Sequence, residues 1–283
     1  MKSILVPYDF SEEAENAFLL AQELATMAAC KLKLVHIIEI PSSQNFSSTG
    51  EMAVGENFID KIYMIDLVNK RKEQFKKLEE EHSGKAYQFS FNISFGNPYA
   101  GISAGIAEMN ADLVIMGSKG SSGLEELLIG SNTEKVVRRS ECPVITVKSN
   151  VTASSIKKIV FASDFTESSK KVILKLKTLQ EMVGAEIKLV KINTPNSFEN
   201  SIASIKKIDK FIKENQLKNV KAEVFNGDSE EEGINDFADY IDADLIAMAT
   251  HGRTGFLHLL SGSIAEDVVN SSKRPVWTMK FKK

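Results

Sequence analysis

The sequence repeats itself, and this repeat constrains the fold more than any other feature. KSILVPYDFSEE, starting at Lys2, is matched by KKIVFASDFTES at Lys157, an offset of 155 residues. ADLVIMGSKG, starting at Ala111, is matched by ADLIAMATHG at Ala243, an offset of 132. The first copy therefore holds about 23 extra residues between its two blocks. A chain of 283 residues is long enough for two domains, and we expect them at 1–150 and 151–283.

Each copy alternates apolar strand patterns with helical ones. The continuous apolar runs at 113–116 and 245–248 are typical of central strands covered on both faces, whereas 87–93 and 220–224 alternate as a sheet edge does. Parallel neighbours need crossover connections, which here are helical. The pattern predicts an α/β fold with two tandem, doubly wound parallel sheets and helices on both faces. The charged stretch 58–81 predicts the extra helix of the first copy.

A block of glycines follows the fourth strand of the first copy, where Gly117, Gly120 and Gly130 lead to Ser131. Ligands in doubly wound sheets bind outside the carboxyl ends of the strands, and glycine lets a phosphate approach the backbone. Ser131 and Glu134 have the spacing of a capping box, which predicts a helix N-terminus able to hold an anion. A glycine turn before a capped helix is also ordinary structure, so both interpretations stay open.

An aspartate follows the first strand of each copy, Asp9 in one and Asp164 in the other. An acid before a helix is favourable at the positive end of the helix dipole even without a ligand. If the first and fourth strands are neighbours, however, Asp9 and Gly117 leave the sheet at one crevice, where an acid can bind a ribose or a base edge. The sequence alone leaves the structural and the functional roles about equally favoured.

Composition and motifs exclude several functions. Lys+Arg 35 against Asp+Glu 38 gives a net charge of −3, which supplies no basic face for nucleic acid. The two cysteines stand far apart without metal-ligand spacing, and no apolar run approaches the ~20 residues of a membrane span. Phosphate-loop, dinucleotide-fingerprint and nucleophile-elbow motifs are absent. We expect a cytoplasmic binding protein with no catalytic residue, no metal site, and no nucleic-acid or membrane partner.

The motifs together resemble the universal stress protein family in its tandem form. They are an Asp-Phe turn after the first strand, G-x2-G-x9-G-S after the fourth, and Pro-Val in the last strand. The resemblance covers nearly the whole chain and implies a five-stranded sheet of order 3-2-1-4-5 in each half. It also implies a stress-response regulator that binds an adenine nucleotide, ATP or else ADP or AMP, with Mg²⁺ held only through phosphates. A scaffold without ligand and a slow ATP hydrolase remain alternatives.

The resemblance assigns nucleotide-binding residues in the first half. Asp9 would meet the nucleoside end, and the backbone at Ile37 would meet the base. Lys119 stands where many members have His, and it either adds a positive charge or is a solvated surface residue. The first-half set is Pro7, Tyr8, Asp9, Ile37, Met116, Gly117, Lys119, Gly120, Gly130, Ser131 and Asn132.

The second half matches the family pattern less completely. Ala249 stands in place of the first glycine, and Ala162 in place of Pro7. A methyl group where backbone should approach a ligand makes the first half the preferred site. The second-half set is Asp164, Ile192, His251, Gly252, Gly262, Ser263 and Ile264.

The last strand of each half begins with a proline, Pro143 or Pro275, a position that an edge strand tolerates. Exposed edges tend to be paired or covered. The resemblance implies that the two last strands pair with each other, as an intramolecular pseudo-dimer. A protein partner of unknown identity is a further expectation. The inserted helix is a candidate surface for a homodimer, although a solvated amphipathic helix is the favoured interpretation.

Overall fold

The computed structural model describes residues 1–39, 58–119, 129–251 and 263–281, with the backbone alone described at 58–63, 167–168, 251, 263 and 281. The first half consists of β1 (Ser3–Pro7), α1 (Glu12–Ala28), β2 (Lys31–Ile38), α2 (Phe58–Glu81), β3 (Gln88–Phe95), α3 (Pro98–Met109), β4 (Leu113–Gly117), α4 (Ser131–Arg139) and β5 (Val144–Val147). The second half consists of the short 3-10 turn η1 (Ala153–Ser155), β6 (Lys158–Ala162), α5 (Glu167–Val183), β7 (Glu186–Asn193), α6 (Ser201–Glu214), β8 (Val220–Asn226), α7 (Glu230–Tyr240), β9 (Leu245–His251), α8 (Ser263–Ser271) and β10 (Val276–Phe281).

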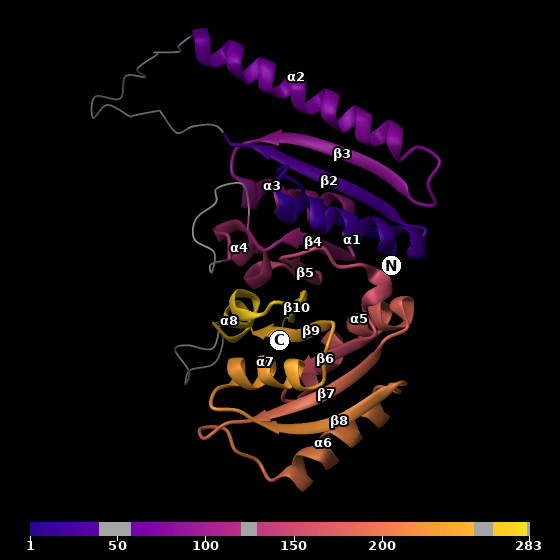
Figure 1. Ribbon diagram of the computed structural model, residues 1–283, viewed down its shortest axis with the longest axis vertical. Helices are drawn as coiled ribbons and strands as arrows, with labels where there is room; N and C mark the ends of the chain where they lie inside the picture. The colour runs from indigo at the N-terminus through magenta and orange to yellow at the C-terminus, as the bar shows by residue number, and fades with distance from the viewer. Residues whose placement is uncertain (40–57, 120–128, 252–262, 282–283) are drawn as a thin grey trace, which may run out of the picture.

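The described strands form one ten-stranded sheet in the order β3-β2-β1-β4-β5-β10-β9-β6-β7-β8 (Figure 1). Strands within each half are parallel, and each half has the predicted order 3-2-1-4-5. β5 and β10 pair antiparallel, with Trp277 opposite Ile145. The predicted fold class and the predicted pairing of the last strands are both confirmed. β3 and β8 are the edges of the sheet, as their alternating patterns predicted.

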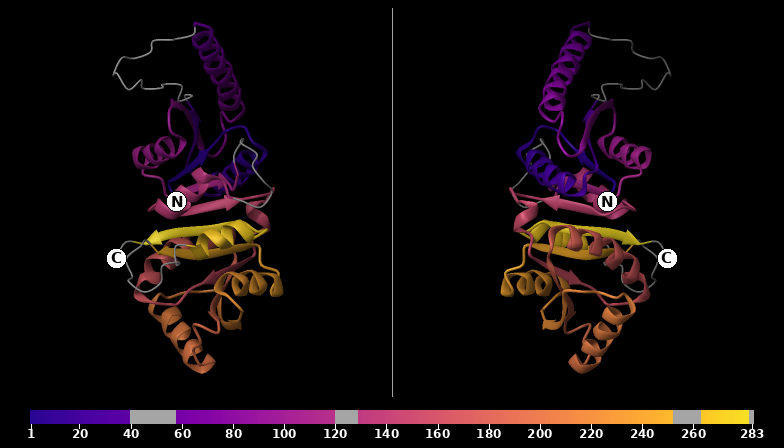
Figure 2. Two further views of the ribbon diagram at one scale, coloured as in Figure 1. Left: turned by 90° about the vertical axis from the view of Figure 1, so that its left-hand side faces the viewer. Right: turned by 90° about the vertical axis from the view of Figure 1, so that its right-hand side faces the viewer.

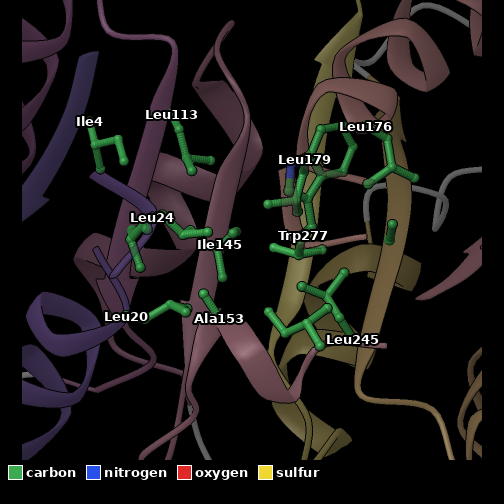
Figure 3. Close-up of a cluster of buried hydrophobic side chains, with 14 of the residues drawn as sticks. Ile4, Leu20, Leu24, Leu113, Ile145, Ala153, Leu176, Leu179, Leu245 and Trp277 are labelled. Carbon is green, nitrogen blue, oxygen red and sulfur yellow. The ribbon is translucent and has the colours of Figure 1, made fainter. Parts of the chain in front are cut away.

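Helices cover both faces of the sheet. Phe75 of α2 and Phe211 of α6 belong to the same buried cluster as α1 and α5, whereas α3, α4, α7 and α8 cover the other face. Both clusters contain residues from the two halves, so the hydrophobic core crosses the β5–β10 junction on each face. Figure 3 shows Ile145 and Ala153 on one side of this junction and Leu179 and Trp277 on the other.

Polar contacts also join the halves. The guanidinium of Arg138 in α4 donates two hydrogen bonds to the carboxylate of Glu266 in α8, each 2.6 Å long. Glu23 in α1 accepts from the backbone N–H of Ala153, 2.7 Å away, just after the polar segment between the halves. No described helix is long and apolar enough to cross a membrane.

The inserted helix α2 lies against the outer end of the first half (Figure 2). Its Phe75 is fully buried and stacks on Phe91 of β3, with ring centroids 5.0 Å apart. The charged side chains at Lys72, Glu73 and Lys76 are exposed. The helix therefore has one buried aromatic anchor and a solvated outer face, as its sequence indicated. The polar segment predicted before this helix, at 42–55, lies outside the described residues.

Candidate functional site

The predicted crevice between the first and fourth strands is present, because β1 and β4 are hydrogen-bonded neighbours. Gly117 ends β4 and is buried. The hydroxyl of Thr133 donates to the Gly117 carbonyl at 3.0 Å, and the N–H of Gly130 donates to the Ser118 carbonyl at 2.8 Å. These two bonds hold the start of α4 against the carboxyl end of β4.

Helix α4 begins without a side-chain cap. Its N-cap is Gly130, whereas the capping-box pattern placed the cap at Ser131, so that prediction was wrong by one residue. Gly130 and Ser131 are both acceptable N-cap residues, and the carbonyl of Gly130 accepts the first helical bond from Glu134 at 2.9 Å. By contrast, Ser11 caps α1 by accepting from the N–H of Ala14. The first N–H groups of α4 therefore meet no capping oxygen from their own N-cap.

A buried hydroxyl without a hydrogen-bond partner lies at the carboxyl end of the fourth strand in each half: Ser118 directly follows β4, and Thr250 is the next-to-last residue of β9. Ser118 is 2% exposed and Thr250 is 7% exposed, and neither hydroxyl oxygen has a partner. Continuing the alternation of β4 from Met116 places the Ser118 side chain on the α3–α4 face of the sheet, and Thr250 follows Met248 in the same way. A buried polar group left unpaired costs about 1–3 kcal/mol, so its recurrence at one place in both halves suggests a missing partner.

Lys148 is a cleft residue that the sequence reasoning missed. It directly follows β5, whose last residue, Val147, pairs with Gly117 and accepts from the N–H of Ser118 at 2.9 Å. Burial lowers the pKa of the Lys148 ammonium, and the nearby positive charge of Lys119 lowers it further. The signal that could have found it is a lysine after the fifth strand, because the fourth and fifth strands end at the same edge.

The carboxylate of Asp9 is engaged in its own turn. One oxygen accepts from the Ser11 N–H at 3.0 Å and from the Ser11 hydroxyl at 2.6 Å. Asp164 repeats the arrangement with the Thr166 hydroxyl at 3.1 Å. Phe10, next to Asp9, has the left-handed φ of 67° that this turn requires. The structural role that the sequence left open is therefore present at both aspartates.

The backbone groups of Ile37 are directed toward the β1 side of β2. The N–H of Tyr8 donates to the Val35 carbonyl at 2.9 Å, so odd-numbered residues of β2 direct their backbone groups toward β1. The β1–β2 register ends at Pro7 opposite Val35, which places the Ile37 backbone beyond the last pair. Ile192 has the same position in the second half, beyond Ala162 opposite Val190.

Tyr8 differs from the other first-half candidates because its ring is in the core. It lies edge-on to Phe18 at 5.7 Å, and its hydroxyl donates to the carboxylate of Glu15. Burial and this hydrogen bond raise the pKa of the phenol. The Tyr8 carbonyl contacts His36 Nδ1 at 2.7 Å, and burial lowers the pKa of that imidazole. His36 is thus a buried residue of β2.

The glycine at 117 is required by packing. A Cβ there would lie 2.7 Å from the Cβ of Glu13 and 2.9 Å from its carbonyl carbon, both in α1. Its counterpart Ala249 contacts the cluster on the same α1–α5 face. The Ala249 methyl group, which made the first half the preferred site in the sequence, is therefore directed away from the face of the sheet where α8 begins.

The remaining candidates divide between described and undescribed residues. Met116 is buried, Lys119, Gly130 and Asn132 are half-buried, and Ser131 is exposed. Ile264 is half-buried near the start of α8, while His251 and Ser263 are described by backbone alone. Gly120, Gly252 and Gly262 lie outside the described residues.

In the part of the chain that the structure describes, the predicted residues contribute neither to a metal cluster nor to the cavity at the other end of the strands. Among the side chains that the structure describes, no group of three or more His, Cys, Asp or Glu could hold a metal ion. A cavity of about 470 Å³ lies at the opposite ends of β4 and β5, where Asp112, Pro143 and Lys175 contribute to its wall. It contains none of the candidate nucleotide-binding residues.

Comparison with known proteins identifies the family. The family model described as the universal stress protein family matches residues 1–148 and again residues 155–280. The chain belongs to the universal stress protein family. Universal stress protein MJ0577 of Methanocaldococcus jannaschii is 34% identical over 154 residues, covering 52% of this chain and 94% of that protein. YxiE of Bacillus subtilis is 32% identical over 148 residues, covering 51% of this chain and 97% of the relative.

Solved structures of the family show the same fold. A universal stress protein from Archaeoglobus fulgidus aligns over 98% of both chains with a TM-score of 0.76 at 19% identity. Another universal stress protein has been solved in complex with cAMP and covers 44% of this chain and 96% of its own, with a TM-score of 0.36 at 17% identity.

Proposed function

We propose that this chain is a stress-response regulator of the cytoplasm that binds an adenine nucleotide, ATP in the first instance, in the crevice of its first half. We also propose the division into domains at 1–150 and 151–283. The nucleoside would lie between Asp9 and the Ile37 backbone, and the phosphates would lie at the start of α4. ADP and AMP offer the same base and ribose with fewer phosphates.

The observation that carries this proposal is the unpaired, buried hydroxyl of Ser118 beside an uncapped helix. Ser118 is 2% exposed, its carbonyl receives the N–H of Gly130, and Gly130 is the N-cap of α4. A helix N-terminus carries unpaired N–H groups and about half a positive charge. An anionic oxygen there would accept from those N–H groups, from the Ser118 hydroxyl and from the ammonium groups of Lys119 and Lys148.

The same chemistry indicates what the site would do with ATP. At the start of α4 the described residues supply hydrogen-bond donors and the positive charges of Lys119 and Lys148, and Asp9 is the carboxylate that the family resemblance assigns to the nucleoside end. A bound Mg²⁺ would therefore be held chiefly by the phosphates themselves. Among the described residues of the crevice we identify no base placed to activate water, so we propose binding, rather than turnover, as the activity. The second half repeats the buried hydroxyl at Thr250 and is proposed as a weaker second site.

A calorimetric titration of ATP into the intact protein tests the proposal. We expect the wild-type chain to give saturable heat of ATP binding. The heat that is lost in the Gly120→Val variant is assigned to the site in the first half. Ser118→Ala removes one neutral donor and is expected to weaken binding by about threefold to tenfold. Ser83→Ala, which removes an exposed serine in the turn after α2, is the control and is expected to leave binding unchanged.

Two results would overturn the proposal. Absence of heat and of any thermal shift with ATP, ADP and AMP would favour a scaffold without ligand. Phosphate release that disappears with Gly120→Val would instead favour a slow hydrolase, while release that persists in this variant would indicate a contaminant.

A further inference from the structure

We propose that Asn270, a residue of the second half, is a positioning residue for the nucleotide crevice of the first half. This inference rests on the proposed function, because the crevice it serves is the proposed nucleotide site. Asn270 lies in the last turn of α8. It contacts two separate elements of the first crevice, one through its side chain and one through its main chain.

The side chain of Asn270 holds the residue that leads into α4. The N–H of Ile129 donates to the amide oxygen of Asn270 at 2.7 Å. Ile129 directly precedes Gly130, the N-cap of α4, whose own N–H donates to Ser118 at 2.8 Å. Two successive N–H groups are therefore fixed, one by each half, immediately before the N–H groups that would bind phosphate.

The main chain of Asn270 holds Lys148. The Lys148 ammonium donates to the Asn270 carbonyl. The last carbonyls of a helix have no partner within the helix and favour a cation. Burial, and after it the positive charge of Lys119, lowers the pKa of Lys148. The Asn270 carbonyl accepts from the Lys148 ammonium and so holds this side chain at the end of β5.

Helix α8 contacts the first half through helix α4. Val268 is fully buried, Val269 is 1% exposed, and Glu266 receives both hydrogen bonds from Arg138. A side chain on this helix thus acts from a fixed support. The second half completes the first crevice whether or not it binds a ligand of its own.

Calorimetric titration of ATP into the full-length Asn270→Ala variant tests the inference. Loss of the bond to Ile129 is expected to weaken the heat assigned to the first half by about threefold to tenfold. Ser271→Ala is the matched control, because Ser271 is the next residue of α8 and bonds only within the second half, to Asp267 and Asn235. It is expected to leave the affinity for ATP unchanged.

A second variant provides a readout that loss of stability alone would not produce. Asn270→Asp keeps an acceptor for the Ile129 N–H but adds a negative charge beside the phosphate end. We expect it to weaken ATP binding more than AMP binding, because ATP carries more negative charge, whereas Asn270→Ala should weaken both by a similar factor.

The outcomes separate this inference from the proposed function. If the wild-type chain gives no heat with ATP, the proposed function fails, and this inference fails with it. If the wild type binds and Asn270→Ala binds equally well, only the inference fails. Equal weakening by Asn270→Ala and Ser271→Ala, or an unchanged ratio of ATP to AMP affinity in Asn270→Asp, would likewise overturn it.

Discussion

Gly117→Ala separates the packing role of the glycine block from a ligand-binding role. The added methyl would stand 2.7 Å from the Cβ of Glu13 and 2.9 Å from its backbone carbonyl carbon. Ordinary contact begins near 3.4 Å, so the start of α1 would have to move by several tenths of an ångström. Overpacking of this kind costs about 1–3 kcal/mol. For a chain of this size that corresponds to a fall in Tm of roughly 2–10 °C.

The assay is thermal unfolding in the absence of any nucleotide, followed by circular dichroism. Ala249→Gly is the matched control, because it makes the opposite change at the counterpart position. It should cost no more than about 1 kcal/mol, from backbone entropy. If Gly117→Ala unfolds at the wild-type temperature yet no longer binds ATP, the glycine serves the ligand, and the packing argument is refuted.

Three further outcomes are expected. Burial lowers the pKa of His36 in the folded chain. As the pH falls below about 6.5, the unfolded chain therefore binds a proton at His36 more readily than the folded chain does, and the free energy of unfolding decreases. The urea midpoint should then drop, and His36→Gln should flatten this dependence; identical pH profiles would contradict it. Trp277→Ala, at a fully enclosed position of the junction, should cost about 3–5 kcal/mol in urea unfolding, and a cost under about 1 kcal/mol would contradict the packing. A double-mutant cycle on Arg138 and Glu266 should give about 0.5–1 kcal/mol that shrinks in concentrated salt, because Arg138 is 45% exposed; coupling insensitive to salt would argue against an ion pair.

Much of the architecture was predictable because it follows local patterns. The inserted helix occupies 58–81 as predicted. Two prolines that each begin an apolar strand indicated edge strands, and the family resemblance implied that β5 and β10 pair with each other. Edge strands were recognisable because one wet face leaves an alternating sequence. The repeat fixed the number of halves, since each block occurs twice.

The parts of the site that were missed depend on contacts between distant segments. Lys148 and Asn270 are 122 residues apart, and no local pattern connects them. The unpaired state of the Ser118 hydroxyl is a property of its surroundings, which a sequence does not display. The requirement for glycine at 117 comes from helix α1, which precedes it by about a hundred residues. The candidate residues were therefore chosen from the sequence by type, whereas the contacts that surround them came only from the structure.

Because the two halves belong to one polypeptide, the contacts between them need not be symmetric. In a dimer of identical subunits, each contact across the axis occurs twice, so a substitution changes both copies together. Here Arg138 and Asn270 are counterparts at the 132-residue offset, yet Arg138 forms an ion pair with Glu266 while Asn270 bonds to Ile129 and Lys148. Under the proposed function, the Arg138 contact joins the two halves, while the Asn270 contacts position the nucleotide crevice.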